Sequence, residues 1–181
     1  MKRNIIIFLL SIILSACQFN LPSSEEFLNK NGVTKETYIK LNLCQQLDIV
    51  TRFGFNYIDE DHSVIIFPSW TKDNFTKPNL VDDLLICFKN NYDNLIEGTA
   101  NANGNENEVR GQIKTTLYLL IELKLMKEPI AKEIYFDAIC NRNITDDLSL
   151  LDFYYYINFS NFPDKISKTD DIVNTICSTK L

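Results

Sequence analysis

PNLVDDLLICFKNNYDNLIEG, residues 78–98, is the stretch that indicates the fold most clearly. Its apolar side chains recur every three to four positions, so they lie on one face of an amphipathic helix. We expect Asn79, which follows Pro78, to be the N-cap, and Gly98 to end the helix. The stripe consists of Val81, Leu84, Leu85, Phe88, Tyr92, Leu95 and Ile96. The stretch therefore predicts a helix that packs by one face against a helical core.

Five further helical segments are predicted around this one. The first begins at Thr34 as N-cap, and its stripe is Ile39, Leu43, Leu47 and Val50. The others run from about Glu108 to Lys127, from about Pro129 to Cys140, and onward from Thr145 and from Thr169. We therefore expect a mainly α, single-domain bundle of five or six helices in residues 25–181.

Residues 53–67 allow two interpretations. The helix that begins at Thr34 ends at Gly54 or continues toward Ile58, because the helical period of its apolar residues continues that far. Alternatively, residues 53–58 and 63–67 form a small β-hairpin, because Phe53, Phe55 and Tyr57 alternate with polar or small residues and the second stretch favours strands.

Two surfaces are candidates for binding a partner. Asp59, Glu60 and Asp61 form an acidic loop beside His62; we interpret it mainly as a solvated turn and expect no metal site there, because no second set of ligands accompanies it. The predicted helices at 108–127 and after Thr145 are apolar on two opposite faces. Such helices are typical of a bundle centre, but the alternative is an aromatic docking patch that holds Tyr154, Tyr156 and Phe162.

Cysteine usage indicates two disulfides. Beyond Cys17, the chain holds Cys44, Cys87, Cys140 and Cys177, which permit three pairings. We favour Cys44 with Cys87 and Cys140 with Cys177, because each pair joins neighbouring predicted helices; in the chain-entropy model each bond stabilises by roughly 3 to 4 kcal/mol. The alternative is four buried free thiols.

Residues 1–17 form an export signal. Lys2 and Arg3 precede an apolar run, Ile5–Leu14, that is too short to span a bilayer about 30 Å thick. Leu14-Ser15-Ala16-Cys17 closes the run and resembles the lipobox of bacterial lipoproteins. The resemblance implies that residues 1–16 are a signal peptide, that Cys17 is diacylated, and that acyl chains attach the protein to a lipid bilayer. Residues 17–24 then form a lipidated tether; the alternative is an ordinary secretory signal.

The resemblance also implies a location in the cell envelope. In lipoproteins of Gram-negative cells, aspartate after the acylated cysteine usually retains the protein on the inner membrane, and this chain has Gln18. We therefore expect the outer membrane, with the domain facing the periplasm. Without Lys2 and Arg3, 16 basic residues accompany 24 acidic ones, a formal charge of −8. Nucleic acid is consequently an unfavourable partner.

No sequence motif for catalysis accompanies the signal. The chain has a single histidine, His62, and five glycines, and it contains no nucleophile elbow, zinc-protease helix, Walker A motif or dinucleotide fingerprint. We expect no enzyme activity and no cofactor. The interpretation is a lipoprotein that binds a protein partner, of the immunity, exclusion or secretion-accessory type. The alternative is a carrier of lipid or another apolar small molecule, which would need a continuous apolar cavity between helices.

Overall fold

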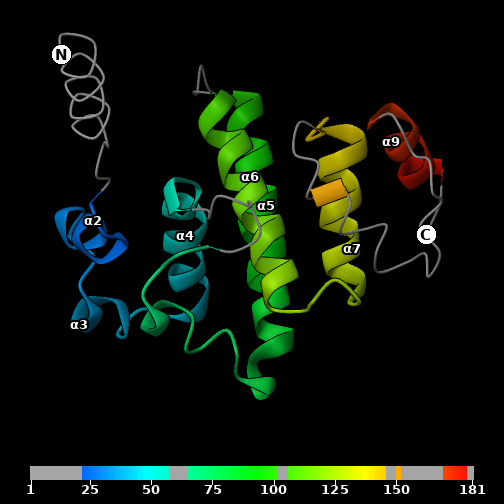
Figure 1. Cartoon of the computed structure of the whole chain (residues 1–181). Helices are drawn as coiled ribbons and strands as arrows, with labels where there is room; N and C mark the ends of the chain where they lie inside the picture. The colour runs from blue at the N-terminus through cyan, green and yellow to red at the C-terminus, as the bar shows by residue number, and fades with distance from the viewer. Residues whose placement is uncertain (1–21, 58–64, 102–105, 146–149, 152–168, 179–181) are drawn as a thin grey trace, which may run out of the picture.

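The computed structural model describes residues 22–57, 65–101, 106–145, 150–151 and 169–178. This part of the chain is a mainly α-helical bundle, as predicted (Figure 1). Its α-helices are α2 (Ser24–Lys30), α3 (Lys35–Tyr38), α4 (Leu43–Gly54), α5 (Val81–Asn101), α6 (Glu106–Glu122), α7 (Pro129–Phe136) and α9 (Thr169–Ser178). Short 3-10 turns occur at Phe55–Tyr57, Ser69–Thr71 and Pro78–Leu80, and a π-helical turn, Asp137–Asn141, follows α7.

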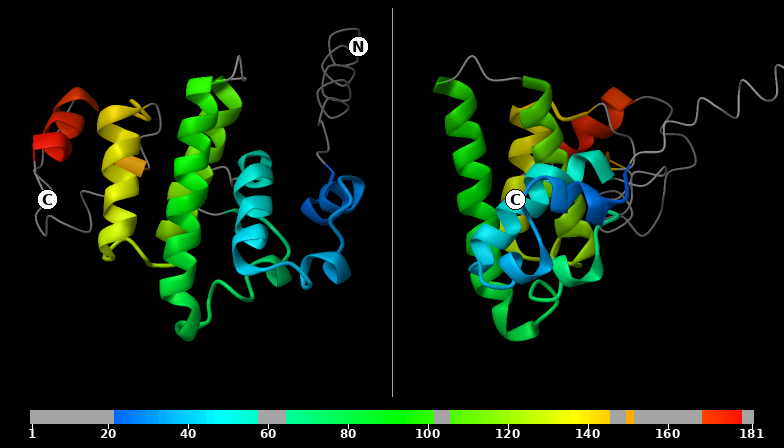
Figure 2. Two further views of the ribbon diagram at one scale, coloured as in Figure 1. Left: turned by 180° about the vertical axis from the view of Figure 1, so that it is seen from behind. Right: turned by 90° about the vertical axis from the view of Figure 1, so that its left-hand side faces the viewer.

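The centre of the bundle is the antiparallel pair α5 and α6. α4 packs against both helices on one side of the pair, and α7 packs against both on the other (Figures 1 and 2). α2 and α3 lie outside α4, while α9 lies beyond α7 and contacts the π-turn. The described helices therefore form a row, with the α5–α6 pair in its middle.

Burial of α6 on several sides confirms that the helix predicted at residues 108–127 lies at the bundle centre, although it ends at Glu122. Six consecutive residues, Thr115–Leu120, are buried. The hydroxyls of Thr115 and Thr116 donate to the carbonyl oxygens of Gly111 and Gln112, both at 2.9 Å, so these buried groups are satisfied. The other helix expected at the centre, after Thr145, lies mostly outside the described residues, although Leu150 and Leu151 are fully buried.

The segment after Thr34 forms two helices, not the single helix predicted. Thr34 is the N-cap of α3, as expected, but α3 ends at Tyr38. A second capping box then starts α4: the Asn42 side chain accepts from the Gln45 N–H at 2.9 Å, and Gln45 Oε1 accepts from the Asn42 N–H at 3.1 Å. Ile39, assigned to the buried stripe, is consequently 59% exposed.

Gln46 stabilises this break from inside the core. Its buried Nε2 donates to the carbonyl oxygens of Tyr38 and Leu41, each at 3.1 Å, so two carbonyls at the end of α3 are satisfied without a continuing helix. The Tyr38 hydroxyl donates to the Thr71 carbonyl oxygen at 2.6 Å. Burial, and secondarily the charge of Asp73, raises the pKa of Tyr38, so its hydroxyl stays a donor.

Two other boundaries differ from the predictions. α2 begins at Ser24, inside the segment expected to be a tether, because Ser23 and Glu26 form a capping box. α5 begins at Val81 after a 3-10 turn and runs through Gly98 to Asn101, so Asn79 is not its N-cap. Gly98 does not adopt the left-handed conformation of a helix-ending glycine, and its cost within a helix is only about 1 kcal/mol relative to alanine.

The hairpin interpretation of residues 53–67 is wrong for its described first half. Phe53 and Gly54 are the last residues of α4, and Phe55–Tyr57 is a 3-10 turn. After the gap in the described residues, the Ile66 N–H donates to the Tyr57 carbonyl oxygen at 2.6 Å. The helix therefore ends at Gly54, the first of the two ends considered for it.

Both disulfide pairings are confirmed. Cys44 on α4 bonds Cys87 on α5, with the Cα atoms 4.9 Å apart. Cys140 in the π-turn bonds Cys177 on α9, with the Cα atoms 5.7 Å apart. The first bond joins two helices of the core, and the second holds the last described helix to the end of α7.

Candidate functional site

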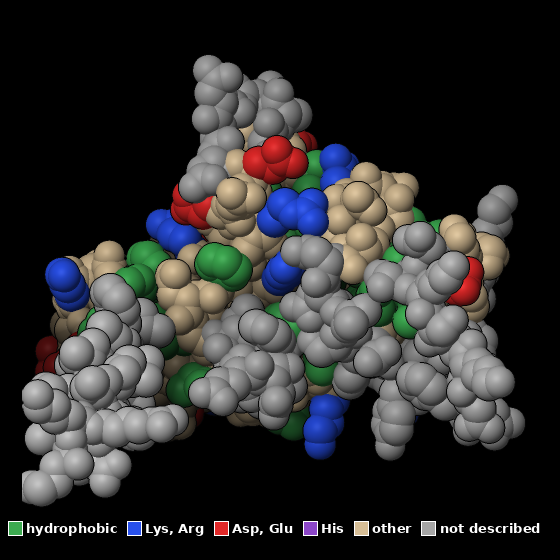
Figure 3. Space-filling model, turned by 45° about the horizontal axis from the view of Figure 1, so that its top comes forward, with side chains coloured by type: hydrophobic (Ala, Val, Ile, Leu, Met, Phe, Trp, Pro, Cys, Tyr) green, Lys and Arg blue, Asp and Glu red, His purple; other side chains and the backbone are tan. Residues whose placement is uncertain are grey.

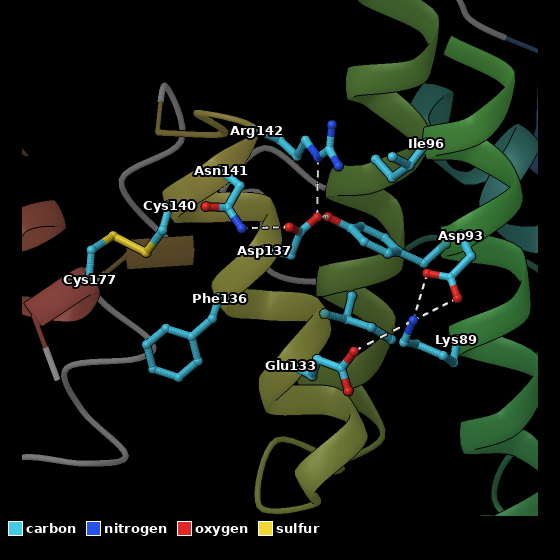
Figure 4. A pocket seen from close by; sticks show the side chains of 12 residues that line it. Lys89, Asp93, Ile96, Glu133, Phe136, Asp137, Cys140, Asn141, Arg142 and Cys177 are labelled. Atoms are coloured by element: carbon cyan, nitrogen blue, oxygen red, sulfur yellow. Dashed lines mark hydrogen bonds and ion pairs between the residues drawn. A yellow bond between two sulfur atoms is a disulfide. The ribbon is translucent and has the colours of Figure 1, made fainter. Parts of the chain in front are cut away.

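A cleft of about 500 Å³ lies between α5 and the end of α7. The face of α5 that borders it presents positions i, i+3, i+4 and i+7 of one helix, and the opposite wall is α7 with its π-turn. The lining residues are Lys89, Tyr92, Asp93, Ile96, Glu133, Ile134, Phe136, Asp137, Cys140, Asn141, Arg142 and Cys177. Phe136 and the Cys140–Cys177 disulfide lie on the side of α7 away from α5 (Figure 4).

Three side chains of this cleft donate hydrogen bonds to Asp137. Its carboxylate accepts from the Tyr92 hydroxyl at 2.7 Å, from Asn141 Nδ2 at 2.7 Å and from Arg142 Nε at 3.2 Å (Figure 4). Partial burial acts to raise the pKa of Asp137, but the hydrogen bonds from Asn141, Tyr92 and Arg142 outweigh it and lower that pKa overall. The group is thus held as a carboxylate.

The π-turn explains how Arg142 reaches this carboxylate. The Arg142 N–H donates to the Asp137 carbonyl oxygen at 3.0 Å, a bond to the residue five positions earlier. A widened turn of this kind places Asn141 and Arg142 on the same side of the helix as Asp137. The backbone N–H and the side chain of Arg142 therefore both donate to Asp137. Such turns inside helices often mark functional sites.

Tyr92 connects the two walls of the cleft. Its ring is buried in the core, and its hydroxyl reaches Asp137 across the helix interface. Burial first, and then the hydrogen bond to Asp137 and its charge, raises the pKa of Tyr92 far above the ordinary value. The hydroxyl therefore remains protonated and acts as a fixed donor rather than as an acid.

Lys89 forms ion pairs at the other end of the cleft. Its Nζ lies 2.7 and 2.6 Å from the two carboxylate oxygens of Asp93, one turn along α5, and 3.5 Å from Glu133 Oε1 on α7 (Figure 4). The hydrogen bond to Asp93 is the main cause that raises the pKa of Lys89. Two cations and three carboxylates thus line the cleft beside the apolar side chains of Ile96 and Ile134.

Charged and apolar side chains together line the cleft, and its charged groups are paired with one another. Among the described residues, no group of three or more histidine, cysteine, aspartate or glutamate side chains is arranged to hold a metal ion. In the same part of the chain, no helix has the length and hydrophobicity required to cross a bilayer.

The cleft contains two of the candidate site residues, Cys140 and Cys177, and both serve as disulfide partners. Cys44 and Cys87 lie elsewhere, between α4 and α5. The remaining candidates lie outside the described residues: Cys17, Asp59, Glu60, Asp61, Tyr154, Tyr156 and Phe162.

The polar residues of the cleft were missed in the sequence. Tyr92 was counted as part of an apolar stripe, and its hydroxyl gave no signal of a partner 45 positions away. Lys89 and Asp93, spaced for an ion pair along a helix, were a detectable signal. The convergence of Asp137, Asn141 and Arg142 depends on the π-turn, which helical periodicity does not predict.

Comparison with known proteins assigns no family. No family model matches the sequence, and no solved structure matches it. The chain is similar to a probable phenylalanine–tRNA ligase beta subunit of Vairimorpha ceranae (strain BRL01), with 28% identity over 118 residues that cover 55% of this chain and 23% of that protein. The chain therefore matches less than a quarter of that protein's length.

Proposed function

We propose that the protein is a lipoprotein of the cell envelope that is anchored through acylated Cys17 and binds a protein partner in the periplasm. The observation that carries the proposal is Leu14-Ser15-Ala16-Cys17 at the end of a short apolar run that begins after two basic residues. Gln18 after the cysteine favours the outer membrane. The function is non-enzymatic and of the immunity, exclusion or secretion-accessory type.

The two disulfides support an oxidising compartment. Such bonds persist in extracytoplasmic proteins and are rare where glutathione and thioredoxin keep thiols reduced. In this chain all four cysteines after Cys17 are paired, which leaves Cys17 as the one cysteine outside the two disulfides. This usage supports a periplasmic domain whose first residue is acylated.

The cleft between α5 and α7 is the proposed partner site. Five charged groups line it, so it is not the continuous apolar cavity that a lipid carrier would need. A lipid or apolar carrier, the alternative function, would expose those charges to an apolar ligand at a large desolvation cost. Paired charges of this kind give orientation and specificity to a protein contact.

The chemistry of the cleft favours binding over catalysis. A general acid requires a carboxyl whose pKa is raised toward neutrality, whereas the hydrogen bonds to Asp137 lower its pKa. Likewise, a tRNA partner, which the name of the similar ligase subunit would suggest, is disfavoured by the formal charge of −8 after the predicted cleavage.

Acylation is tested by metabolic labelling with an alkyne fatty acid in a Gram-negative host, followed by intact mass of the purified protein. We expect label on the wild type, none on Cys17→Ser, and a mass that lacks residues 1–16. Gln18→Asp should stay acylated and move to the inner-membrane fraction. An intact leader, or an unmodified thiol at Cys17, would overturn the proposal.

Partner binding is tested by placing a photo-crosslinking amino acid at Ile96, in the cleft, and at the exposed Ile39 as the matched control. We expect one discrete protein crosslinked from Ile96 in living cells and not from Ile39. Crosslinked lipid at Ile96 without protein would favour the carrier. Lys89→Glu combined with Arg142→Glu should abolish the protein crosslink, because it reverses both cleft cations.

A further inference from the structure

A second hollow lies on the opposite side of the α5–α6 pair from the cleft. It has a volume of about 370 Å³ and is bordered by Phe27 of α2, Arg52 and Phe53 of α4, Phe55 of the following turn, and the start of α6. Phe55 is 46% exposed. This aromatic hollow has no role in the partner site proposed above.

Three aromatic side chains beside the hollow, Phe27, Phe53 and Tyr57, are in ring contact. The rings of Phe27 and Phe53 have centroids 5.6 Å apart in an edge-to-face arrangement, and those of Phe27 and Tyr57 are 5.2 Å apart. Phe55 rests on Gly111 of α6, where a Cβ would lie 2.7 Å from its ring. The exposed ring is therefore positioned by its neighbours and presented to the surface.

The tether ends at this cluster. The Tyr57 hydroxyl donates to the Pro22 carbonyl oxygen at 3.2 Å, so the first described residue of the chain is fixed beside the rings. Pro22 follows Cys17 by five positions, and an extended chain of that length spans roughly 18 Å at most. An acyl group on Cys17 consequently holds this end of the domain, and not the α7 end, close to the bilayer (Figure 1).

We infer that the aromatic hollow docks onto the phospholipid surface to which Cys17 is anchored, an inference that rests on the proposed acylation. Aromatic rings favour the membrane–water interface, where the ring enters the boundary of the acyl chains. Arg52 at the rim is half-exposed and forms an ion pair with Asp48, one turn earlier on α4, which it would exchange for a lipid phosphate on docking. Figure 3 shows hydrophobic, basic and acidic side chains together on the face seen there.

Docking at this surface gives the anchor a second function. It orients the domain so that the side formed by α2 and α4 faces the membrane, while the cleft on the other side of the α5–α6 pair faces away from it. The partner site then remains accessible from the periplasm even when the domain lies directly on the membrane. The anchor and the aromatic hollow act together, because the acyl chains supply the affinity and the rings fix the orientation.

Depth-dependent quenching tests the inference on the full chain, purified from membranes and reconstituted into vesicles that contain brominated phosphatidylcholine. Phe55→Trp places a fluorophore in the hollow, and Ile86→Trp is the matched control, because Ile86 is 51% exposed near the opposite end of α5. The wild type, with Trp70 alone, supplies the baseline. We expect bromine to quench Phe55→Trp several-fold more strongly than Ile86→Trp.

A second probe, Asn56→Trp, covers the case in which the larger ring at Phe55 disturbs packing on Gly111, because Asn56 is exposed at the same hollow. Equal quenching at the hollow and at Ile86, in protein whose mass shows acylated Cys17, would overturn this inference alone. A blue shift of the tryptophan emission that does not depend on bromine and grows with protein concentration would show that a second copy of the chain covers the hollow. That result would also overturn the inference. An unmodified Cys17 would remove the proposed function and this inference together.

Discussion

Gly54 and Thr115 are in direct contact where α4 ends against α6: a Cβ built on Gly54 would lie 2.6 Å from Cγ2 of Thr115 and 3.2 Å from Cγ2 of Ile65. Both residues are buried, and the Thr115 hydroxyl is held by Gly111. The absence of a side chain at Gly54 thus determines how closely the last turn of α4 approaches the central helix.

Gly54→Ala should therefore destabilise the protein. Overpacking of a closely packed core destabilises a protein by about 1–3 kcal/mol. The better helix propensity of alanine offsets less than about 1 kcal/mol of this loss. We expect a net loss of about 1–2 kcal/mol in the free energy of unfolding, measured by urea denaturation with the disulfides intact.

Gly98→Ala is the matched control and should have the opposite sign. Gly98 lies within α5, with nothing within 4 Å of the position a Cβ would take. Alanine at this position loses less conformational entropy on folding than glycine does. We therefore expect Gly98→Ala to raise the free energy of unfolding by about 0.5–1 kcal/mol. Equal effects of the two substitutions would show that the contact with Thr115 does not limit the packing of α4.

Lys124→Gly should stabilise the protein. Lys124 has φ of 60° and follows the end of α6, where the Leu125 N–H donates to the Leu120 carbonyl oxygen at 2.9 Å. This is the helix-ending geometry that glycine favours, and a side chain in it costs roughly 1 kcal/mol. We expect a gain of about 0.5–1 kcal/mol by urea denaturation. Glycine at the exposed Lys127 is the control and should give no gain.

These boundaries show which parts of the fold were predictable. The amphipathic period of α5, the apolar character of α6 on opposite faces and the two cysteine pairings were predicted correctly from local spacing. The break after Tyr38 also had a local signal, the capping box of Asn42 and Gln45, but the apolar stripe through Ile39 concealed it. Lys124 ends α6 through a conformation that its residue type does not favour, so the end at Glu122 was not readable from the sequence.

The candidate cleft was far less predictable. Its central interaction joins Tyr92 to Asp137, and no local pattern connects a tyrosine in an apolar stripe with an aspartate 45 positions later. The widened turn that brings Arg142 to the same carboxylate holds the disulfide-bonded Cys140, and no local sequence pattern predicts it. Sequence periodicity assigns side chains to helix faces, but it does not show which faces share a polar network.

The two disulfides should differ in the extent of unfolding that follows their removal. Each bond closes a loop of about 40 residues and contributes roughly 4 kcal/mol in the chain-entropy model. Cys44→Ser with Cys87→Ser releases α4 from α5 and should lower the stability of the whole core. Cys140→Ser with Cys177→Ser releases α9, whose Ile172 and Ile176 are buried, and should mainly unfold that helix.

Hydrogen–deuterium exchange distinguishes these outcomes. We expect the second double variant to lose protection at residues 169–178 while residues 81–122 keep it, and the first to lose protection in both. Uniform loss of protection in the second variant would show that α9 folds cooperatively with the core and is not a separately releasable element.

Asp137 should make stability depend on pH in the acidic range. Hydrogen bonds hold its folded-state pKa below the ordinary value of about 3.9, so the folded protein binds this proton less readily than the unfolded chain does. The stabilisation is therefore complete above about pH 5 and is lost as the pH falls through the folded-state pKa.

Tyr92→Phe removes one donor to the carboxylate and keeps the buried ring, so it should raise the pKa of Asp137 and reduce this loss of stability at low pH. NMR titration of the Asp137 carboxyl carbon in both proteins measures the effect directly, and an unchanged titration midpoint in Tyr92→Phe would show that the hydroxyl does not stabilise the carboxylate.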